Sequence, residues 1–257
     1  MEFTVNKQDI HQGLYKAQGV VDRKSTLNIL SHVLIESVSD VMIRITCTDY
    51  DVVLTGTYAA NVKTTGRIAV AAKSMFDVVK ALPDQPIHIK SMDNHWVELT
   101  CGSSRFKLAG LPANDFPEQT EPIDLNYLSV PKRLLLDMVE RTLFSVSHDE
   151  TRPSLNGVFF RVVREEDELR MLMVSTDGHR LSKSECLGGQ AHDFEAAAEA
   201  ILHHKAISEL KRTLEGPDDD TRVAFKRGNV YFANDEVVLQ VRELDETFPD
   251  YTKVIPN

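Results

Sequence analysis

Hydrophobic residues recur along this chain with two periods, one typical of amphipathic helices and one typical of half-buried strands. The helical period predicts four helices, at about 7–20, 73–82, 131–144 and 204–214. Each helix has one apolar stripe, which we expect to pack on a sheet as a core face. The stripes are Ile10/Leu14/Ala17, Met75/Phe76/Val79/Leu82, Leu135/Met138/Val139/Thr142 and Ile207/Leu210/Leu214. Pro131 suits a first helical position, because its missing N–H costs nothing there.

Short runs of strand-forming residues occupy much of the remaining chain. We expect strands near 3–5, 28–38, 41–48, 52–62, 67–71, 86–91, 95–101, 104–109, 128–130, 154–163, 168–176, 179–187, 196–202, 221–226, 229–234 and 236–243. Strands of this length, grouped between turn residues and combined with four helices, predict an α+β fold in which helices pack on antiparallel sheets.

The second half of the chain repeats the order of the first. The matched residues are Val5 and Lys7 with Val130 and Lys132, Leu27-Asn28 with Leu155-Asn156, Asp49 with Asp177, Lys73 with Lys205, and Phe116-Pro117 with Phe248-Pro249. The separation changes from 125 (130 − 5) to 132 (205 − 73) only across loops, where insertions are tolerated. A duplicated domain explains this pattern, and chance similarity between two α+β segments is the alternative. We place the domains at residues 1–126, which end in an acidic linker, and 127–257.

One hairpin organises the second half. Two strand-like runs flank Asp177-Gly178, a dipeptide that strongly signals a tight turn. The turn brings the side chains of residues 176–181 to one sheet edge. A weaker copy lies at 41–58, where Thr48-Asp49 stands in place of Thr176-Asp177.

Composition places the chain among soluble globular proteins, since 42% of its residues are hydrophobic and 26% are charged. The N-terminal MEFTVNKQDI does not have the pattern of a signal peptide, so we expect a cytoplasmic protein. The three cysteines, Cys47, Cys101 and Cys186, are far apart and are expected to be buried thiols in a reducing compartment.

Residues of catalytic type occur without the spacing that catalysis requires. Ser147, His148 and Asp149 are neighbours in sequence, so their side chains project in different directions and do not converge as a relay. His203-His204 and the acidic run 218–220 lack a third metal donor at helical or hairpin spacing. Nucleotide-binding and metalloprotease motifs are absent from the sequence. We therefore expect no catalytic residue, no metal and no cofactor.

Charge is segregated along the chain. The four expected helices together carry +5, whereas the whole chain carries −10. Lys73, Asp77 and Lys80 share one helix face, and Lys205, Glu209 and Arg212 repeat it, as Lys7 and Lys16 recur in Lys132 and Arg141. For any one helix taken alone, a solvated face with salt-bridged charges explains the charged residues. Four helices with repeated basic positions favour a surface that faces a polyanion.

Several stretches resemble one known family. They are FTV at the start, SRFKLAGLPANDFP at 104–117, SLNGVFF at 154–160, STDGHRL at 175–181 and FPDYTKV at 248–254. In this order they resemble the bacterial replicative sliding clamp, the β subunit of DNA polymerase III. The resemblance implies a clamp fold in which helices line a ring around duplex DNA and the ring tethers polymerase. Such a ring holds DNA by topology and needs only weak phosphate contact, which is compatible with an acidic total.

The resemblance also implies which residues face DNA. They lie in the turn after the first helix, at the start of the second helix of each domain and in the loop before the first long strand of the second domain. The residues are Lys24, Lys73, Asp149, Arg152, Pro153, Ser154, Lys205 and Arg212. Relatives place aromatic residues where Pro153 and Ser154 stand, so the resemblance does not extend to base or sugar stacking at these two positions.

Partners of this family insert a short motif into a cleft beside the second domain. The resemblance implies an apolar floor with a few oriented polar groups and a glycine that admits close backbone approach. The lining expected here is Leu155, Thr176, Gly178, His179, Arg180, Leu181, Pro249, Lys253 and Val254. The partners implied are double-stranded DNA, DNA polymerase, the clamp loader and other proteins with a clamp-binding motif.

Family members have three domains per subunit and close head to tail as dimers, and this chain matches the first two domains. A head-to-tail joint uses two different surfaces. The first-domain surface is expected on a probable edge strand at Phe106 and Leu108. We accordingly expect a monomer for this chain and a homodimer for a three-domain form.

Two other interpretations remain open at this stage. One is a peptide-binding adaptor with no DNA role, which would use only the surface of residues 155, 176–181 and 249–254. The other is a hydrolase that would use His179 with Asp177.

Overall fold

The structure, a computed structural model, describes residues 1–119, 124–165, 168–190, 197–215 and 220–255. The chain divides into two units, residues 1–121 with 235–239 and residues 122–234 with 240–257. Each unit is described by itself. The expected domain boundary at 126/127 stays a prediction.

Residues 1–119, the described part of the first unit's main segment, form two α-helices and nine strands. Its elements are β1 (Glu2–Val5), α1 (Lys7–Val20), η1 (Asn28–Ser31), β2 (His32–Ser39), β3 (Met42–Thr48), β4 (Val52–Thr64), β5 (Arg67–Ala71), α2 (Ala72–Ala81), β6 (Ile87–Ser91), η2 (Asp93–His95), β7 (Val97–Cys101), β8 (Ser104–Leu108), β9 (Gly110–Leu111) and η3 (Ala113–Asp115). Antiparallel pairing gives the strand order β8–β7–β6–β1–β4–β3–β2–β5–β9.

The second unit repeats this plan. Its elements are β10 (Leu128–Val130), α3 (Lys132–Leu143), η4 (Pro153–Leu155), β11 (Gly157–Glu165), β12 (Glu168–Thr176), β13 (Leu181–Gln190), β14 (Ala197–His203), α4 (His204–Thr213), β15 (Thr221–Lys226), β16 (Asn229–Ala233), the end of β17 (Val237–Arg242), whose residues 237–239 belong to the first unit, and η5 (Tyr251–Val254). The strand order is β16–β15–β10–β13–β12–β11–β14, and β17 follows β16.

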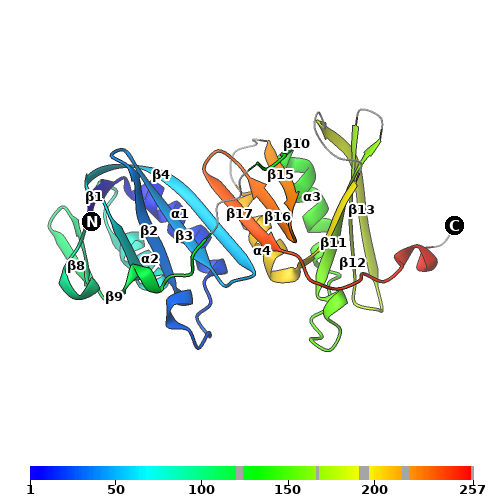
Figure 1. The fold of residues 1–257 in the computed structure, drawn as a ribbon, viewed down its shortest axis with the longest axis horizontal. Helices are drawn as coiled ribbons and strands as arrows, with labels where there is room; N and C mark the ends of the chain where they lie inside the picture. The colour runs from blue at the N-terminus through cyan, green and yellow to red at the C-terminus, as the bar shows by residue number, and fades with distance from the viewer. Residues whose placement is uncertain (120–123, 166–167, 191–196, 216–219, 256–257) are drawn as a thin grey trace. The chain divides into compact units, whose positions relative to one another are not determined.

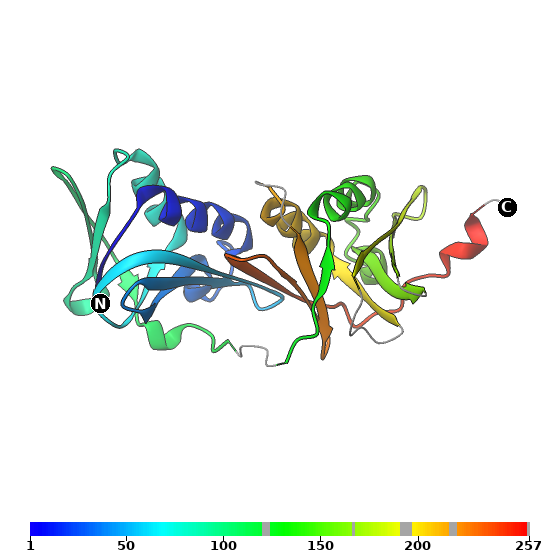
Figure 2. The same ribbon diagram turned by 90° about the horizontal axis from the view of Figure 1, so that it is seen from above.

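Strand pairing confirms the duplication that the sequence predicts. In the first unit β2 lies between β3 and β5, and in the second unit β11 lies between β12 and β14. Likewise β1 is paired with both β4 and β6, as β10 is paired with both β13 and β15. Within each unit the two helices cover one face of the strands (Figure 2). The predicted α+β fold is therefore confirmed.

The apolar stripes of the helices form the core, as predicted, with one exception. Ile10, Leu14 and Met75 are fully buried in the first unit, and Leu135 and Met138 in the second. The placement of Phe76 in this core face is wrong. Phe76 is half-buried and packs against His11 and Tyr15 at the surface of the helix pair.

Three of the differences between expected and observed element boundaries concern the turns around the site and the start of α3. Residues 28–31 and 153–155 are 3-10 turns, so the strands that follow begin at His32 and Gly157. The residue Pro131 is the N-cap of α3 rather than its first helical residue. The turn at 177–180 has four residues, because Thr176 pairs with Leu181.

Some of the basic positions repeated by the duplication are structural. Lys7 Nζ donates to the carbonyl oxygens of Lys80 and Leu82, where α2 ends. These carbonyl groups have no partner inside the helix, so the ammonium group stabilises the helix end. Lys16 and Lys132 are buried. The interpretation of all repeated basic residues as a surface for a polyanion is therefore too broad.

The three cysteines differ in burial. Cys47 and Cys101 are buried, as expected, whereas Cys186 is only half-buried, with Sγ 3.2 Å from Met138 Sδ.

Among the helices in the described ranges, none combines the length and the apolar character needed to cross a membrane.

Glu2 is the centre of an ion cluster on β1. Its carboxylate lies 2.8 Å from Lys63 Nζ, 3.2 Å from His88 Nε2 and 3.4 Å from Lys90 Nζ. Lys63 lies on β4 and the other two residues lie on β6, so the cluster connects the strands on both sides of β1. The hydrogen bond from Lys63, together with those from His88 and Lys90, lowers the pKa of Glu2 from 4.5 to about 2.

This lowered pKa predicts how stability depends on pH. The ionised Glu2 should stabilise the folded protein fully above pH 4.5, and this contribution should be lost as the pH falls from 4.5 through about 2. A Glu2→Gln variant should thus be less stable than the parent at pH 7 and nearly equal to it near pH 2, by urea unfolding. Glu118→Gln, at an exposed position of the same unit, is the matched control. A difference that does not change with pH would contradict this account.

Candidate functional site

The hairpin between β12 and β13 holds its turn with two side chains. Thr176 Oγ1 accepts from Gly178 N (3.1 Å) and donates to Arg180 O (2.7 Å). Asp177 Oδ1 accepts from the backbone N–H groups of His179 (2.9 Å) and Arg180 (3.0 Å), and its Oδ2 accepts from Arg180 Nε (3.0 Å). These bonds, first of all the one from His179, lower the pKa of Asp177 to about 2. The carboxylate is therefore a structural anion, and Gly178, His179 and Arg180 are exposed.

The first unit contains the same turn. Thr48 Oγ1 accepts from Tyr50 N (2.9 Å), and Asp49 Oδ1 accepts from the N–H groups of Asp51 (3.1 Å) and Val52 (2.7 Å). Tyr50 stands where the second unit has Gly178, and both adopt a left-handed backbone, with φ of 79° and 89°. This conformation is strained for a residue with a side chain. The two turns therefore share geometry but differ in strain.

The loop before β11 packs against this hairpin. Asp149 accepts from Thr151 N (3.0 Å) and Thr151 Oγ1 (2.7 Å), and from Arg152 Nε (3.1 Å). With its amide nitrogen turned toward the loop, Asn156 donates to the carbonyl oxygens of Asp149 and Ser147. A Cβ added at Gly178 would lie 3.1 Å from Arg152 Nη1. The structure thus brings Arg152 of the loop next to the hairpin.

The remaining loop residues are positioned by η4. Pro153 and Ser154 begin this turn, and Leu155 ends it with its side chain buried. Its matched residue in the first unit, Leu27, is 49% exposed. The two copies therefore use this leucine differently. In the second unit it packs into the protein beneath the turn.

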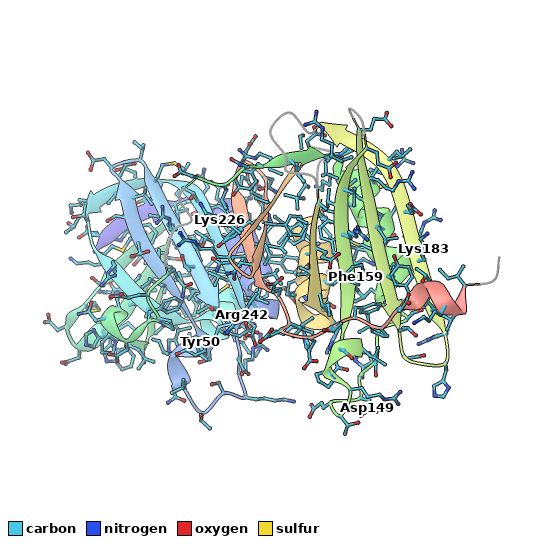
Figure 3. The ribbon with its side chains drawn as sticks, turned by 45° about the vertical axis from the view of Figure 1, so that its right-hand side comes forward. Tyr50, Asp149, Phe159, Lys183, Lys226 and Arg242 are labelled. Atoms are coloured by element: carbon cyan, nitrogen blue, oxygen red, sulfur yellow. The ribbon has the colours of Figure 1, made fainter. Side chains whose placement is uncertain are left out.

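The C-terminal segment lies against the same unit. Phe248 stacks on Phe159 of β11 with ring centroids 5.4 Å apart, and Tyr251 lies 6.2 Å from Phe159. Figures 1 and 3 show this segment running past β11 and β12. Pro249 and Lys253 are exposed, and Val254 is 68% exposed. An apolar side chain presented in this way is available for contact with a partner.

Basic residues at the helix ends differ between the units. Lys73 at the start of α2 is exposed and pairs with Asp77 at 3.0 Å. Arg212 on α4 pairs with Glu209 at 3.6 Å, and Glu209 is buried. The expectation that Glu209 repeats the solvated face of Asp77 is therefore wrong. Lys205 starts α4, where its N–H donates to His203 Nδ1 (3.3 Å). Lys24 is exposed in the turn after α1.

The edge strand of the first unit presents apolar side chains. β8 is paired with β7 and lies at one end of the unit's strand order. Phe106 is 40% exposed and Leu108 is half-buried. Glu98 of β7 forms an ion pair with Arg105 at 2.7 Å. The expected edge strand is thus observed, and its role as a subunit surface stays a prediction.

The catalytic-type residues of the loop do not form a relay. Ser147 is buried and its Oγ accepts from Asp149 N (3.1 Å), while the His148 ring lies edge-on to His204 with centroids 4.8 Å apart. In the described part of the chain no group of three or more His, Cys, Asp or Glu residues has the geometry to hold a metal ion. Sequence reasoning missed the His148–His204 contact, because it joins residues far apart in the chain.

Family models match both units. The model of the DNA polymerase III beta subunit N-terminal domain matches residues 1–120, and that of its central domain matches residues 129–250. The chain belongs to this family. A beta sliding clamp of Caulobacter vibrioides is 30% identical over the whole chain, and one of Pseudomonas putida is 32% identical, with 68% of each relative covered.

Solved structures agree with this assignment. A DNA polymerase sliding clamp from Caulobacter crescentus has a TM-score of 0.91 at 29% identity, with the whole chain and 69% of that protein covered. A sliding clamp from Bartonella birtlesii bound to griselimycin has a TM-score of 0.89 at 31% identity, and 68% of it is covered. The fold is therefore the clamp fold, and the chain is a DNA polymerase processivity factor of the sliding-clamp family.

An alanine substitution should lower stability more at Gly178 than at Tyr50, the matched residue of the other turn. Gly178→Ala should destabilise the second unit of the clamp by about 1 kcal/mol, because alanine is strained at positive φ and its Cβ meets Arg152. Tyr50→Ala, at the matched position of the first unit, should change stability less, because the parent residue already has a Cβ. Chemical unfolding of both variants measures this. Equal losses would contradict the proposed origin of the strain.

Proposed function

We propose that this clamp chain encircles duplex DNA as part of a ring, docks DNA polymerase and other replication proteins through a peptide-binding cleft, and catalyses no reaction. The observation that supports this proposal most strongly is the repeated unit, because each copy has the same strand pairing and a helix pair on one face. In this proposal each unit presents its helix pair to the DNA.

The DNA contacts in this proposal are weak and cationic. Lys24 and Lys73 in the first unit are exposed at the ends of helices, and Arg152 is exposed in the second. Ion pairs with Asp77 and Asp149 partly neutralise Lys73 and Arg152. A clamp that slides needs phosphate contacts that form and break easily, since many strong contacts would hold it in place. The other members of the proposed DNA-facing set are Asp149, Pro153, Ser154, Lys205 and Arg212.

The partner cleft in this proposal is formed by residues 155, 176–181 and 249–254. The hairpin turn is fixed by the Asp177 carboxylate, so its exposed groups are held ready for a partner. Arg180 lies over the ring of Phe144, with 5.8 Å to the ring centroid. Val254 supplies an exposed apolar contact. A fixed turn with apolar and cationic groups suits a short peptide with apolar anchors and a carboxylate.

Subunit contact is proposed at the β8 edge, through Phe106 and Leu108. A head-to-tail ring joins this surface to a different surface of the next subunit. The three-domain homodimer, the monomeric state of this chain and its cytoplasmic location stay predictions.

Charge reversal tests DNA encirclement. In the complete ring, Lys73→Glu combined with Lys205→Glu should lower DNA loading and polymerase processivity. The slope of the logarithm of the duplex-binding constant against the logarithm of salt concentration should also decrease, by the amount expected for about two lost phosphate contacts. Arg164→Glu with Arg227→Glu makes the same charge change at two exposed strand and turn positions and is the control. Unchanged loading and processivity in the first variant would favour a peptide-binding adaptor without a DNA role.

A single substitution tests the cleft. Val254→Asp should weaken binding of a clamp-binding-motif peptide by at least about tenfold, because a buried carboxylate would replace an apolar contact. Ile255→Asp changes the neighbouring exposed apolar residue and should have a smaller effect. Titration calorimetry with the peptide measures both. Peptide binding that resists Val254→Asp would place the cleft elsewhere.

A further inference from the structure

Three aromatic rings gather on the helix side of the first unit. His11 and Tyr15 lie one turn apart on α1, and the ring of Phe76 on α2 lies 5.1 Å from the His11 ring and 6.4 Å from the Tyr15 ring. The rings are tilted by 34° and 40°, so they do not cover one another face to face. Tyr15 is 42% exposed, and the other two side chains are half-buried. The cluster therefore presents aromatic surface to solvent.

Lysines border these rings. Lys80 Nζ lies 6.0 Å from the centroid of the Phe76 ring. Lys7 precedes His11 by one turn, and its Nζ is held at the end of α2 by the carbonyl oxygens of Lys80 and Leu82. Burial, followed by the charges of Lys7 and Lys80, lowers the pKa of His11. The lowered pKa favours the neutral form of the imidazole, which lies beside two lysines.

The second unit shows that the clamp fold does not need this cluster. The offsets between the repeats place Leu136 and Glu140 where α1 has His11 and Tyr15 (11 + 125 and 15 + 125), and Ser208 where α2 has Phe76 (76 + 132). There, Glu140 forms an ion pair with Lys211 at 2.9 Å, and Ser208 donates to the carbonyl oxygen of His204. The helix pair of the second unit therefore packs without aromatic rings at these positions.

We propose that this aromatic–lysine patch, formed by Lys7, His11, Tyr15, Phe76 and Lys80, binds single-stranded DNA. Bases in a duplex have their faces covered by stacking, whereas unpaired bases offer both faces to an aromatic ring. Exposed aromatic rings beside lysines are the chemistry with which proteins hold single strands. Tyr15 and Phe76 take the bases, and Lys80 contacts a phosphate.

This inference goes beyond the proposed function, which requires only phosphate contacts to duplex DNA. A clamp with one such patch has two kinds of DNA contact. The phosphate contacts act anywhere along a duplex, and the patch acts only where a strand is unpaired. The patch therefore gives the clamp a preference for places where duplex and single strand meet.

The test is binding of fluorescein-labelled oligothymidylate and of a labelled duplex to the full chain, measured by fluorescence anisotropy at low salt. Tyr15→Leu removes a ring but keeps an apolar side chain on the surface. This variant should bind oligothymidylate about tenfold more weakly, the effect of one lost stacking contact, with duplex binding unchanged. Tyr50→Leu removes another exposed tyrosine of the same unit and should change neither.

The position of the contact is tested separately. Photocrosslinking with an oligothymidylate that contains 5-bromodeoxyuridine should label the peptide that includes Tyr15 or the one that includes Phe76. Unchanged oligothymidylate binding by Tyr15→Leu, an equal loss for duplex, or crosslinks confined to residues 176–181 would overturn the proposal. These outcomes are distinct from a failure of the clamp function, which the loading and processivity of the Lys73→Glu, Lys205→Glu ring report.

Discussion

Each unit depends on one short strand that is hydrogen-bonded on both sides. β1 has only four residues, yet it pairs with β4 and with β6, and its Phe3 and Val5 are buried. A strand this short, paired on one side only, would gain little from its hydrogen bonds. Pairing on both sides fixes the residue that precedes α1 and so sets where the helix begins. β10 holds the same place before α3.

This constraint explains why the fold could be predicted from the sequence and why some details could not. Periodicity identified all four helices, and the matched positions identified the duplication, because both depend on local pattern and burial. The sequence predicts strand at 28–31 and at 154–155, where the structure has 3-10 turns, because a short segment directly before a strand does not show where that strand begins. Whether Leu155 is buried and Leu27 exposed depends on packing around each turn, which no local pattern reveals.

The candidate site was predictable to the extent that it lies in one hairpin. Asp177 and Gly178 signal their own turn, and the structure shows the carboxylate accepting from the backbone as such a turn requires. The proximity of Arg152 to Gly178 was not predictable, because it joins a loop and a hairpin that are separated by two strands. Phe76 was assigned to the core because it extends an apolar stripe. Phe76 lies outside the core because it packs against His11 of α1, and this contact between two helices cannot be read from the pattern of either helix alone.

The two copies of the unit share the side chains that hold the turn backbone and differ in the side chains that the turn exposes. Thr48 and Asp49 make the same hydrogen bonds as Thr176 and Asp177, so the turn is maintained in both units. At its tip one copy has Tyr50 and the other Gly178. A tyrosine in a left-handed conformation is strained, whereas glycine leaves room for a close approach by a partner backbone. In the functions proposed above, the second copy therefore supplies the docking turn, and the first copy, with its aromatic rings on α1 and α2, supplies the surface for unpaired bases. Duplication followed by such changes lets one fold hold two kinds of contact without altering its core.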